Sequence, residues 1–254
     1  MVPTQSTAAS KTAKFYDMRL DKYLQDTYNL RSRTYAENLI KTGGVLVNGK
    51  VVTKPSYDVT DGDRIEVSDD GYASQGAYKL EEAFSKFGLS VIGKVCADIG
   101  CSNGGFTDCL LRHGAEFVYA LDVAECALQP SLLECGKVEF VRANARELPT
   151  DFNKVEFVCS DVSFISLKLV LPEIFRILKL GGEAVVLVKP QFELDKSALG
   201  KSGIVTNEKL RIRALEGIKA CAISLGFQIL NIATSPIRYQ NKNVEYLLHL
   251  RKPF

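Results

Sequence analysis

The chain has 254 residues, of which 46% are apolar and 24% charged, a composition typical of folded globular proteins rather than disordered or fibrous ones. Its formal net charge of +2 is too small to identify a partner. No apolar run approaches the roughly 20 residues that a membrane span needs, so we expect no membrane-embedded part.

The cysteines and histidines argue against several kinds of site. The seven cysteines are odd in number and include no Cys-x-x-Cys pair, and the two histidines are His113 and His249. The sequence also shows no secretory signal pattern. We therefore expect a cytoplasmic protein with neither a disulfide framework nor a bound metal.

The predicted elements begin after a polar stretch. Residues 1–18 are rich in Ser, Thr, Ala and Lys without periodicity, which predicts a flexible tail. Apolar residues at helical spacing predict one helix from Leu20 to about Tyr28 and another from Ser32 to Lys41. The turn pair Asn48-Gly49 between valine-rich runs predicts a hairpin over 45–52, and an alternating strand follows at Arg64–Val67.

This small unit, residues 19–68, carries an excess of positive charge. Residues 1–54 contain nine Lys and Arg against four Asp and Glu, which favours either a polyanion contact or a solvated surface. The run RLDKYL, SRTYAENLIKTGGVLVNGKVV and DVTDGDRIEV resembles the S-four RNA-binding domain, first described in a small-subunit ribosomal protein. The resemblance implies that five basic residues meet RNA phosphates, namely Arg31, Arg33, Lys41, Lys50 and Lys54.

Beyond a short polar linker, residues 69–75, strand-like and helix-like segments alternate over residues 76–254. The predicted strands are Lys94–Ile99, Phe117–Asp122, Val138–Val141, Val155–Ser160, Glu183–Val188, Phe227–Thr234 and Val244–Arg251. The predicted helices cover 76–88, 104–113, 167–180 and 207–225. This alternation predicts an α/β domain whose seven-stranded, mostly parallel sheet has helices on both faces, with its last two strands antiparallel at one edge. Ligands of such sheets bind beyond the carboxyl ends of the strands.

A glycine-rich turn in VCADIGCSNGGFTDCLL is the candidate cofactor loop. Its spacing, G-x-x-x-G-G, is not that of dinucleotide-binding proteins, and a tight structural turn is an alternative explanation. Polar residues near the ends of three strands strengthen the cofactor interpretation. Asp98 can face a cationic cofactor group, Asp122 can accept ribose hydroxyls, and Asn144-Ala145 can line an adenine. We expect S-adenosylmethionine rather than NAD.

Four charged residues lie where the predicted fold places its ligand crevice. Asp161 and Lys189 each follow an apolar strand, Glu245 lies in an apolar run, and Lys79 lies in the helix before the cofactor strand. Charges at half-buried positions are costly unless paired, so a purely structural ion-pair cluster is the alternative. In a methyl transfer to a ribose hydroxyl, Lys189 would act as base or stabilise the alkoxide if burial and Lys79 lower its pKa. The sequence does not decide which lysine moves the proton.

Residues 72–254 resemble the TlyA group of the FtsJ-like ribose 2′-O-methyltransferases, which fold as Rossmann-like S-adenosylmethionine-dependent domains. The resemblance rests on YASQGAYKLEEAF, ADIGCSNGGFTDCLL, ALDV, NAREL, SDVSFISL, LVKPQFE and SPI…NVEYL. It implies methylation of cytidine 2′-hydroxyls in small- or large-subunit ribosomal RNA, or both, and a catalytic tetrad of Lys79, Asp161, Lys189 and Glu245. The implied cofactor residues are Asp98, Gly100, Ser102, Gly104, Gly105, Phe106, Asp122, Asn144, Ala145 and Asp161.

Three departures from the family pattern leave alternatives open. Gln75 replaces a usual arginine, Asn103 a usual threonine and Lys242 a common glycine. An RNA-binding protein that has lost catalysis is one alternative, and a methyltransferase for proteins or small molecules is another. A membrane-active haemolysin is the third, because the family has carried that label, and its only physical basis would be the stretch Leu167–Leu180.

Overall fold

The computed structural model describes residues 18–28, 33–41, 44–67, 72–74, 76–200, 202–236 and 243–254. The chain divides into two compact units, residues 1–71 and 72–254. Several sequence-based expectations lie outside the described residues: the tail over 1–17, most of the linker, the RNA-contact candidate Arg31, and the departures Gln75 and Lys242.

The first unit is a small α+β fold. Its helices are α1 (Leu20–Thr27) and α2 (Arg33–Lys41), and its strands are β1 (Met18–Arg19), β2 (Val45–Val47), β3 (Lys50–Val51), β4 (Asp58–Val59) and β5 (Ile65–Val67). The strands form one sheet in the order β3-β2-β5 and a pair β1-β4. The apolar residues that predicted the helices meet those of β2 and β4 in one core, which includes Leu20, Leu24, Ile40 and Val45. Met18 was expected in the tail but pairs with Val59, since the backbone there is extended.

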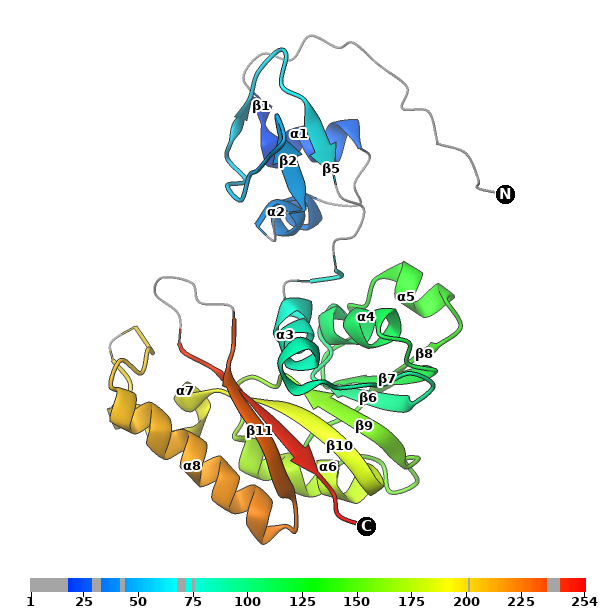
Figure 1. The fold of residues 1–254 in the computed structure, drawn as a ribbon, viewed down its shortest axis with the longest axis vertical. Helices are drawn as coiled ribbons and strands as arrows, with labels where there is room; N and C mark the ends of the chain where they lie inside the picture. Colours follow the sequence, from blue (N-terminus) through cyan, green and yellow to red (C-terminus); the bar gives the residue numbers. More distant parts are fainter. Residues whose placement is uncertain are drawn as a thin grey trace. The chain divides into compact units, whose positions relative to one another are not determined.

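The second unit is built on a seven-stranded sheet, as the sequence predicts (Figure 1). The strands are β6 (Val95–Ile99), β7 (Phe117–Asp122), β8 (Val138–Arg142), β9 (Val155–Ser160), β10 (Leu178–Val188), β11 (Gln228–Thr234) and β12 (Tyr246–Arg251). Their order is β11-β12-β10-β9-β6-β7-β8. The neighbours from β10 to β8 are parallel, whereas β12 is antiparallel to both β10 and β11.

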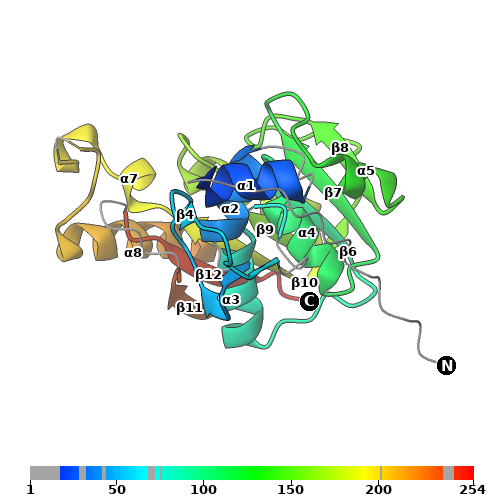
Figure 2. The same cartoon turned by 90° about the horizontal axis from the view of Figure 1, so that it is seen from above.

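Helices cover both faces of this sheet (Figure 1). They are α3 (Ala77–Phe87), α4 (Gly105–Arg112), α5 (Pro130–Glu134), α6 (Leu171–Ile177), α7 (Pro190–Glu193) and α8 (Glu208–Ser224), with short 3-10 turns η1 (Leu167–Leu169) and η2 (Lys196–Ala198). Alternate residues of β10 separate the two layers, because successive side chains of a strand point to opposite faces. Ala184, Val186 and Val188 pack with α6 and α8, whereas Val185 and Leu187 pack with α3 and α4. Figure 2 shows α7 beside α8, which it contacts.

The stretch Leu167–Leu180 is not one helix, contrary to the sequence-based expectation. It forms η1, α6 and the first residues of β10, and Leu171, Ile174 and Ile177 are fully buried in the core. These three residues therefore face the sheet, whereas Leu169 and Leu180 are exposed singly outside α6. The basis suggested for a membrane-active surface helix is accordingly wrong. No helix in the described part of the chain has the length and apolar character that a bilayer crossing requires.

Candidate active site

The four charged residues come together at one edge of the sheet. Asp161 directly follows β9, Lys189 directly follows β10, and both strands end at the same edge because they are parallel. Strand β12 runs the opposite way, so Glu245, which precedes it, lies at that edge too. Lys79 is supplied by the first turn of α3. The topology thus gathers residues that are up to 166 positions apart in the chain.

The tetrad forms a continuous chain of ion pairs. Lys79 Nζ lies 2.7 Å from Glu245 Oε2 and 3.2 Å from Asp161 Oδ2. Lys189 Nζ lies 2.6 Å from Asp161 Oδ1 and donates a hydrogen bond of 2.8 Å to Ser163 Oγ. The four side chains are between 8% and 19% exposed, so the charges are mostly screened from water by protein. Each charge has an opposite charge beside it, which is what makes their burial tolerable.

The electrostatics of the tetrad follow from these pairs. Burial alone would raise the pKa of Asp161, but the ammonium groups of Lys79 and Lys189 outweigh burial and lower it. Burial alone would lower the pKa of Lys79, but Asp161 and Glu245 outweigh burial and raise it. Asp161 is therefore a carboxylate, and Lys79 a cation, throughout the physiological pH range.

A cleft of about 560 Å³ opens beside the tetrad, and Asp161 belongs to both. The cleft lies at the ends of β6, β7, β8 and β9, beside the point where the strand order reverses. Its apolar walls include Leu121, Val123, Ala143 and Val162. The volume suits a ligand of the size of a nucleoside cofactor.

Two glycines of the glycine-rich turn have no room for a side chain. Gly100 has a φ of 85°, and an added Cβ would lie 3.2 Å from Val162 Cγ1 and 3.3 Å from the backbone oxygen of Asp161. An added Cβ on Gly104, whose φ is 90°, would lie 2.6 Å from Leu132. Both positions therefore favour glycine. The turn lies directly against Asp161, and through it beside Lys189.

Asp122 is held at the end of β7 by two backbone amides. Its carboxylate accepts hydrogen bonds from Ser102 N at 2.9 Å and from Ala124 N at 3.0 Å. Each carboxylate oxygen has a further lone pair, so the group can still accept hydrogen bonds from two ribose hydroxyls. The cleft thus fits an adenosyl ligand with a ribose at Asp122. Gly100, Ser102, Asn144 and Ala145 line the same cleft, as do Arg146 and the loop over 162–165.

Four expected cofactor residues do not line this cleft: Asp98, Gly104, Gly105 and Phe106. Asp98 is completely buried and accepts a hydrogen bond of 2.8 Å from Thr107 Oγ1. Burial raises the pKa of Asp98 to about 7. Asp98 is the last residue but one of β6, so its side chain points to α4. An added Cβ on Gly105 would lie 2.2 Å from Ser74 Oγ, so this glycine permits close packing of the segment before α3.

Two residues of the site, Ser163 and Phe164, lie within the motif SDVSFISL but are not among the site residues expected from the sequence. Phe164 is 87% exposed and has a φ of 66°, a strained conformation for a bulky residue. Its ring centroid lies 5.3 Å from that of Phe192, and Lys189 Nζ lies 5.9 Å from the centroid of Phe192. Ser163 accepts the hydrogen bond from Lys189. An exposed aromatic surface therefore flanks the amine of Lys189.

In the first unit, the described candidates for RNA contact differ in how far their charges are already paired with carboxylates. Arg33 donates two hydrogen bonds to Asp21 Oδ2, at 3.1 and 2.9 Å, and Arg19 also pairs with this fully buried carboxylate. Although burial alone would raise the pKa of Asp21, these arginines lower it to about 2. Lys50 and Lys54 are exposed, and Lys41 pairs with Glu37 at 3.3 Å.

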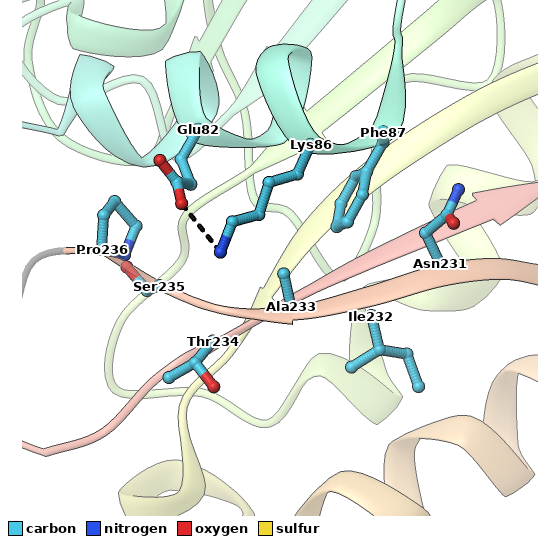
Figure 3. Close-up of a pocket in the computed structure, with 9 residues that line it drawn as sticks. All are labelled: Glu82, Lys86, Phe87, Asn231, Ile232, Ala233, Thr234, Ser235 and Pro236. Carbon is cyan, nitrogen blue, oxygen red and sulfur yellow. Dashed lines mark ion pairs between the residues drawn. The ribbon is translucent and has the colours of Figure 1, made fainter.

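A second hollow, of about 490 Å³, lies between α3 and the edge strand β11 (Figure 3). Figure 3 shows Glu82 and Lys86 joined in an ion pair of 2.9 Å above residues 231–236 of β11 and its end. Its described lining contains no glycine, and its charged groups pair with each other. It is therefore a weaker candidate for a nucleoside cofactor than the cleft beside the tetrad.

The fold and site can be set against known proteins. The family model for FtsJ-like methyltransferases matches residues 72–252, and the model for the S4 (S-four) domain matches residues 18–65. The chain belongs to the FtsJ-like methyltransferase family. It carries an S-four domain ahead of the methyltransferase fold.

Relatives of this FtsJ-like methyltransferase match it over most of its length. Hemolysin A of Brachyspira hyodysenteriae is 41% identical over 91% of this chain and 99% of that protein. The 16S/23S rRNA (cytidine-2′-O)-methyltransferase TlyA of Mycobacterium tuberculosis is 38% identical over 92% of this chain and 89% of that protein. A solved structure from Streptococcus thermophilus, described as a hemolysin, has a TM-score of 0.71 and 37% identity over 93% of this chain and 89% of that chain.

Proposed function

We propose that this FtsJ-like methyltransferase transfers a methyl group from S-adenosylmethionine to the ribose 2′-hydroxyl of cytidine in ribosomal RNA of the small subunit, the large subunit, or both. The observation that carries the proposal is the ion-pair chain Glu245–Lys79–Asp161–Lys189, which reaches the cofactor-sized cleft through Asp161. The relative named as a 16S/23S rRNA (cytidine-2′-O)-methyltransferase supports the choice of substrate.

In the proposed site, the strand ends hold the cofactor. Asp122 accepts the ribose hydroxyls, while the turn from Gly100 to Ser102 lets the backbone approach closely. Val123, Ala143 and Ala145 provide apolar contacts for the adenine. S-adenosylmethionine would supply an electrophilic methyl group on a sulfonium, which an oxygen nucleophile would attack in line, with S-adenosylhomocysteine as the leaving group.

The tetrad positions the amine that assists removal of the proton from the attacking hydroxyl. Asp161 and Ser163 fix the amine of Lys189 at 2.6 and 2.8 Å, and Lys79 and Glu245 continue the chain behind it. A fixed amine can accept the proton, or donate to the oxygen as its negative charge develops. The positive charge of Lys79 limits the negative charge of Asp161, so the carboxylate orients Lys189 without competing for the proton.

Two kinds of surface bind the RNA in this proposal: an exposed aromatic ring and exposed lysines. The exposed face of Phe164 provides a stacking platform for a base next to the cleft. Lys50 and Lys54 of the S-four domain provide phosphate contacts, which give affinity without reading sequence. Arg33 contributes less, because Asp21 already occupies part of its guanidinium.

The test is transfer of a radiolabelled methyl group to ribosomal RNA, followed by mass-spectrometric mapping of ribose methylation. Purified subunits and free RNA from a strain that lacks the enzyme serve as substrates. We expect label on a cytidine 2′-oxygen. Methylation of a base nitrogen or carbon, or labelling of protein alone, would contradict the proposal.

A further inference from the structure

A second cluster of chemically active side chains lies on α3 and α4, away from the tetrad. Glu81 is on α3, and Cys109 and His113 are on α4 or directly follow it. Positions 109 and 113 are four residues apart and so share one face of the helix. Glu81 is two positions from Lys79, which places the two side chains on nearly opposite sides of α3. The cluster is therefore separate from the proposed catalytic chain.

The three side chains present their ligand atoms to one point. Glu81 Oε2 lies 2.9 Å from His113 Nε2 and 3.8 Å from Cys109 Sγ, and all three atoms lie within 4.8 Å of one another. The hydroxyl of Tyr72 also donates to Glu81 Oε2. A carboxylate oxygen, an imidazole nitrogen and a thiol thus converge; the Cys109 side chain is fully buried, whereas those of Glu81 and His113 are partly exposed.

The distances between these three ligand atoms suit a small cation with tetrahedral coordination. Zinc binds sulfur at about 2.3 Å and nitrogen or oxygen at about 2.0–2.2 Å, which puts tetrahedral ligand atoms about 3.3–3.7 Å apart. The Glu81–His113 distance of 2.9 Å and the Glu81–Cys109 distance of 3.8 Å require shifts of about 0.5 Å or less to reach that geometry, and no two of the three ligand atoms are more than 4.8 Å apart. The donor set of one sulfur, one nitrogen and one oxygen matches zinc better than magnesium or calcium, which prefer oxygen alone.

The orientation of the ligands is also supported by their neighbours. The imidazole of His113 is stacked on Phe84, with centroids 3.9 Å apart and planes 4° from parallel, which directs Nε2 to Glu81. Tyr72 fixes the carboxylate of Glu81, and Arg112 lies 4.6 Å from the centroid of the Tyr72 ring. Such supporting contacts are typical of metal ligands.

We propose that Glu81, Cys109 and His113 form a zinc site that joins α3 to α4, with water as the fourth ligand. The side chains of His113 and Glu81 are 31% and 40% exposed, which leaves an open side for that water. The bound cation would brace the helix that carries Lys79 against the helix that follows the glycine-rich turn. The sequence predicts no metal because it lacks Cys-x-x-Cys pairs, whereas these ligands come from two separate helices.

The experiment measures metal binding by the full chain, purified with chelator and then titrated with Zn²⁺ and with Co²⁺. We expect one ion per chain, and with Co²⁺ a thiolate charge-transfer band together with the intense visible bands of a four-coordinate ion. Because zinc binds a thiolate, binding releases the thiol proton of Cys109, and affinity should rise with pH.

Two variants and one control decide the matter. His113→Gln retains a donor to Glu81 and should weaken binding by at least about tenfold, and Cys109→Ser should in addition abolish the charge-transfer band. The control Cys135→Ser removes an exposed thiol outside the cluster and should bind like the wild type. Near-ultraviolet circular dichroism checks that each variant is folded, and Glu81→Gln replaces any that is not. Absence of stoichiometric binding by the wild type would overturn the proposal. So would wild-type affinity in both His113→Gln and Cys109→Ser. Both outcomes are independent of the methyl-transfer activity.

Discussion

Replacing Lys189 by methionine removes the amine of the proposed proton acceptor while keeping most of the side-chain length. Lys189 Nζ is held between Asp161 Oδ1 at 2.6 Å and Ser163 Oγ at 2.8 Å. A positioned group that moves a proton contributes about 10²- to 10⁴-fold to a rate. We therefore expect kcat for ribose methylation to fall by that factor, with little change in cofactor affinity, because Lys189 does not line the cleft.

The ion-pair chain also limits how much the Lys189→Met substitution lowers the free energy of unfolding. Removing the only partner of a buried charge costs about 3–5 kcal/mol. Asp161 keeps Lys79 at 3.2 Å, so we expect a smaller loss, about 1–2 kcal/mol, close to that of one charged hydrogen bond. For a domain of this size, that lowers Tm by about 2–8 °C. The variant should therefore be folded at the assay temperature.

The assay is single-turnover methyl transfer to ribosomal RNA, with calorimetry of cofactor binding alongside. Lys179→Met is the matched control, since Lys179 lies at the opposite end of β10 and pairs with Glu156 at the surface. It should be as active as the wild type. If Lys189→Met transfers methyl within about tenfold of the wild-type rate, the role proposed for this amine is refuted.

Three further predictions concern the RNA and pH. Phe164→Ala should weaken use of the RNA substrate by about 1–3 kcal/mol, the value of one base stack, as measured by kcat/KM; unchanged kcat/KM would contradict the stacking role. Lys50→Ala with Lys54→Ala should reduce the slope of log affinity against log salt by about two, measured by RNA binding between low and physiological salt, and a slope equal to that of the wild type would mean that neither meets a phosphate. Hydrogen bonding with His249 and pairing with Arg251 lower the pKa of Glu183 to about 2. Its stabilising contribution is therefore complete above the unfolded pKa of about 4.5 and is lost as pH falls towards 2. The Tm deficit of Glu183→Gln at pH 7 should shrink at pH 3, and a constant deficit would contradict this.

The sheet and the tetrad could be predicted because strong local patterns specify them. Lys189 follows five consecutive apolar residues, and a charge directly after a buried strand can only lie at its end. Asp122 lies at the end of β7 for the same reason. Asp98 lies one residue before the end of β6 and therefore still belongs to the strand. Because successive side chains of a strand point to opposite faces, the Asp98 side chain points to Thr107 and α4.

Other features have no reliable signal in a single sequence. Leu178–Leu180 continues the helical spacing of α6, yet its backbone joins β10, since Leu178 pairs with Val155 in the neighbouring strand. The helices α5 and α7 have five and four residues, too few for a helical period to be recognised. The exposure of Phe164 depends on a positive φ, and the meeting of Glu81 with His113 depends on how two helices pack. These are tertiary properties.

The position of β12 has a consequence for the timing of assembly. This strand lies between β10 and β11 and forms hydrogen bonds with both. Without β12, strand β11 is therefore not connected by hydrogen bonds to the rest of the sheet. Glu245 immediately precedes β12 and reaches Lys79 only when this strand is in place. During synthesis the earlier strands and the cofactor turn emerge first, but Lys79 gains its second carboxylate only when the final strand is inserted. A growing chain would thus contain every residue of the cofactor cleft before it can complete the ion-pair chain.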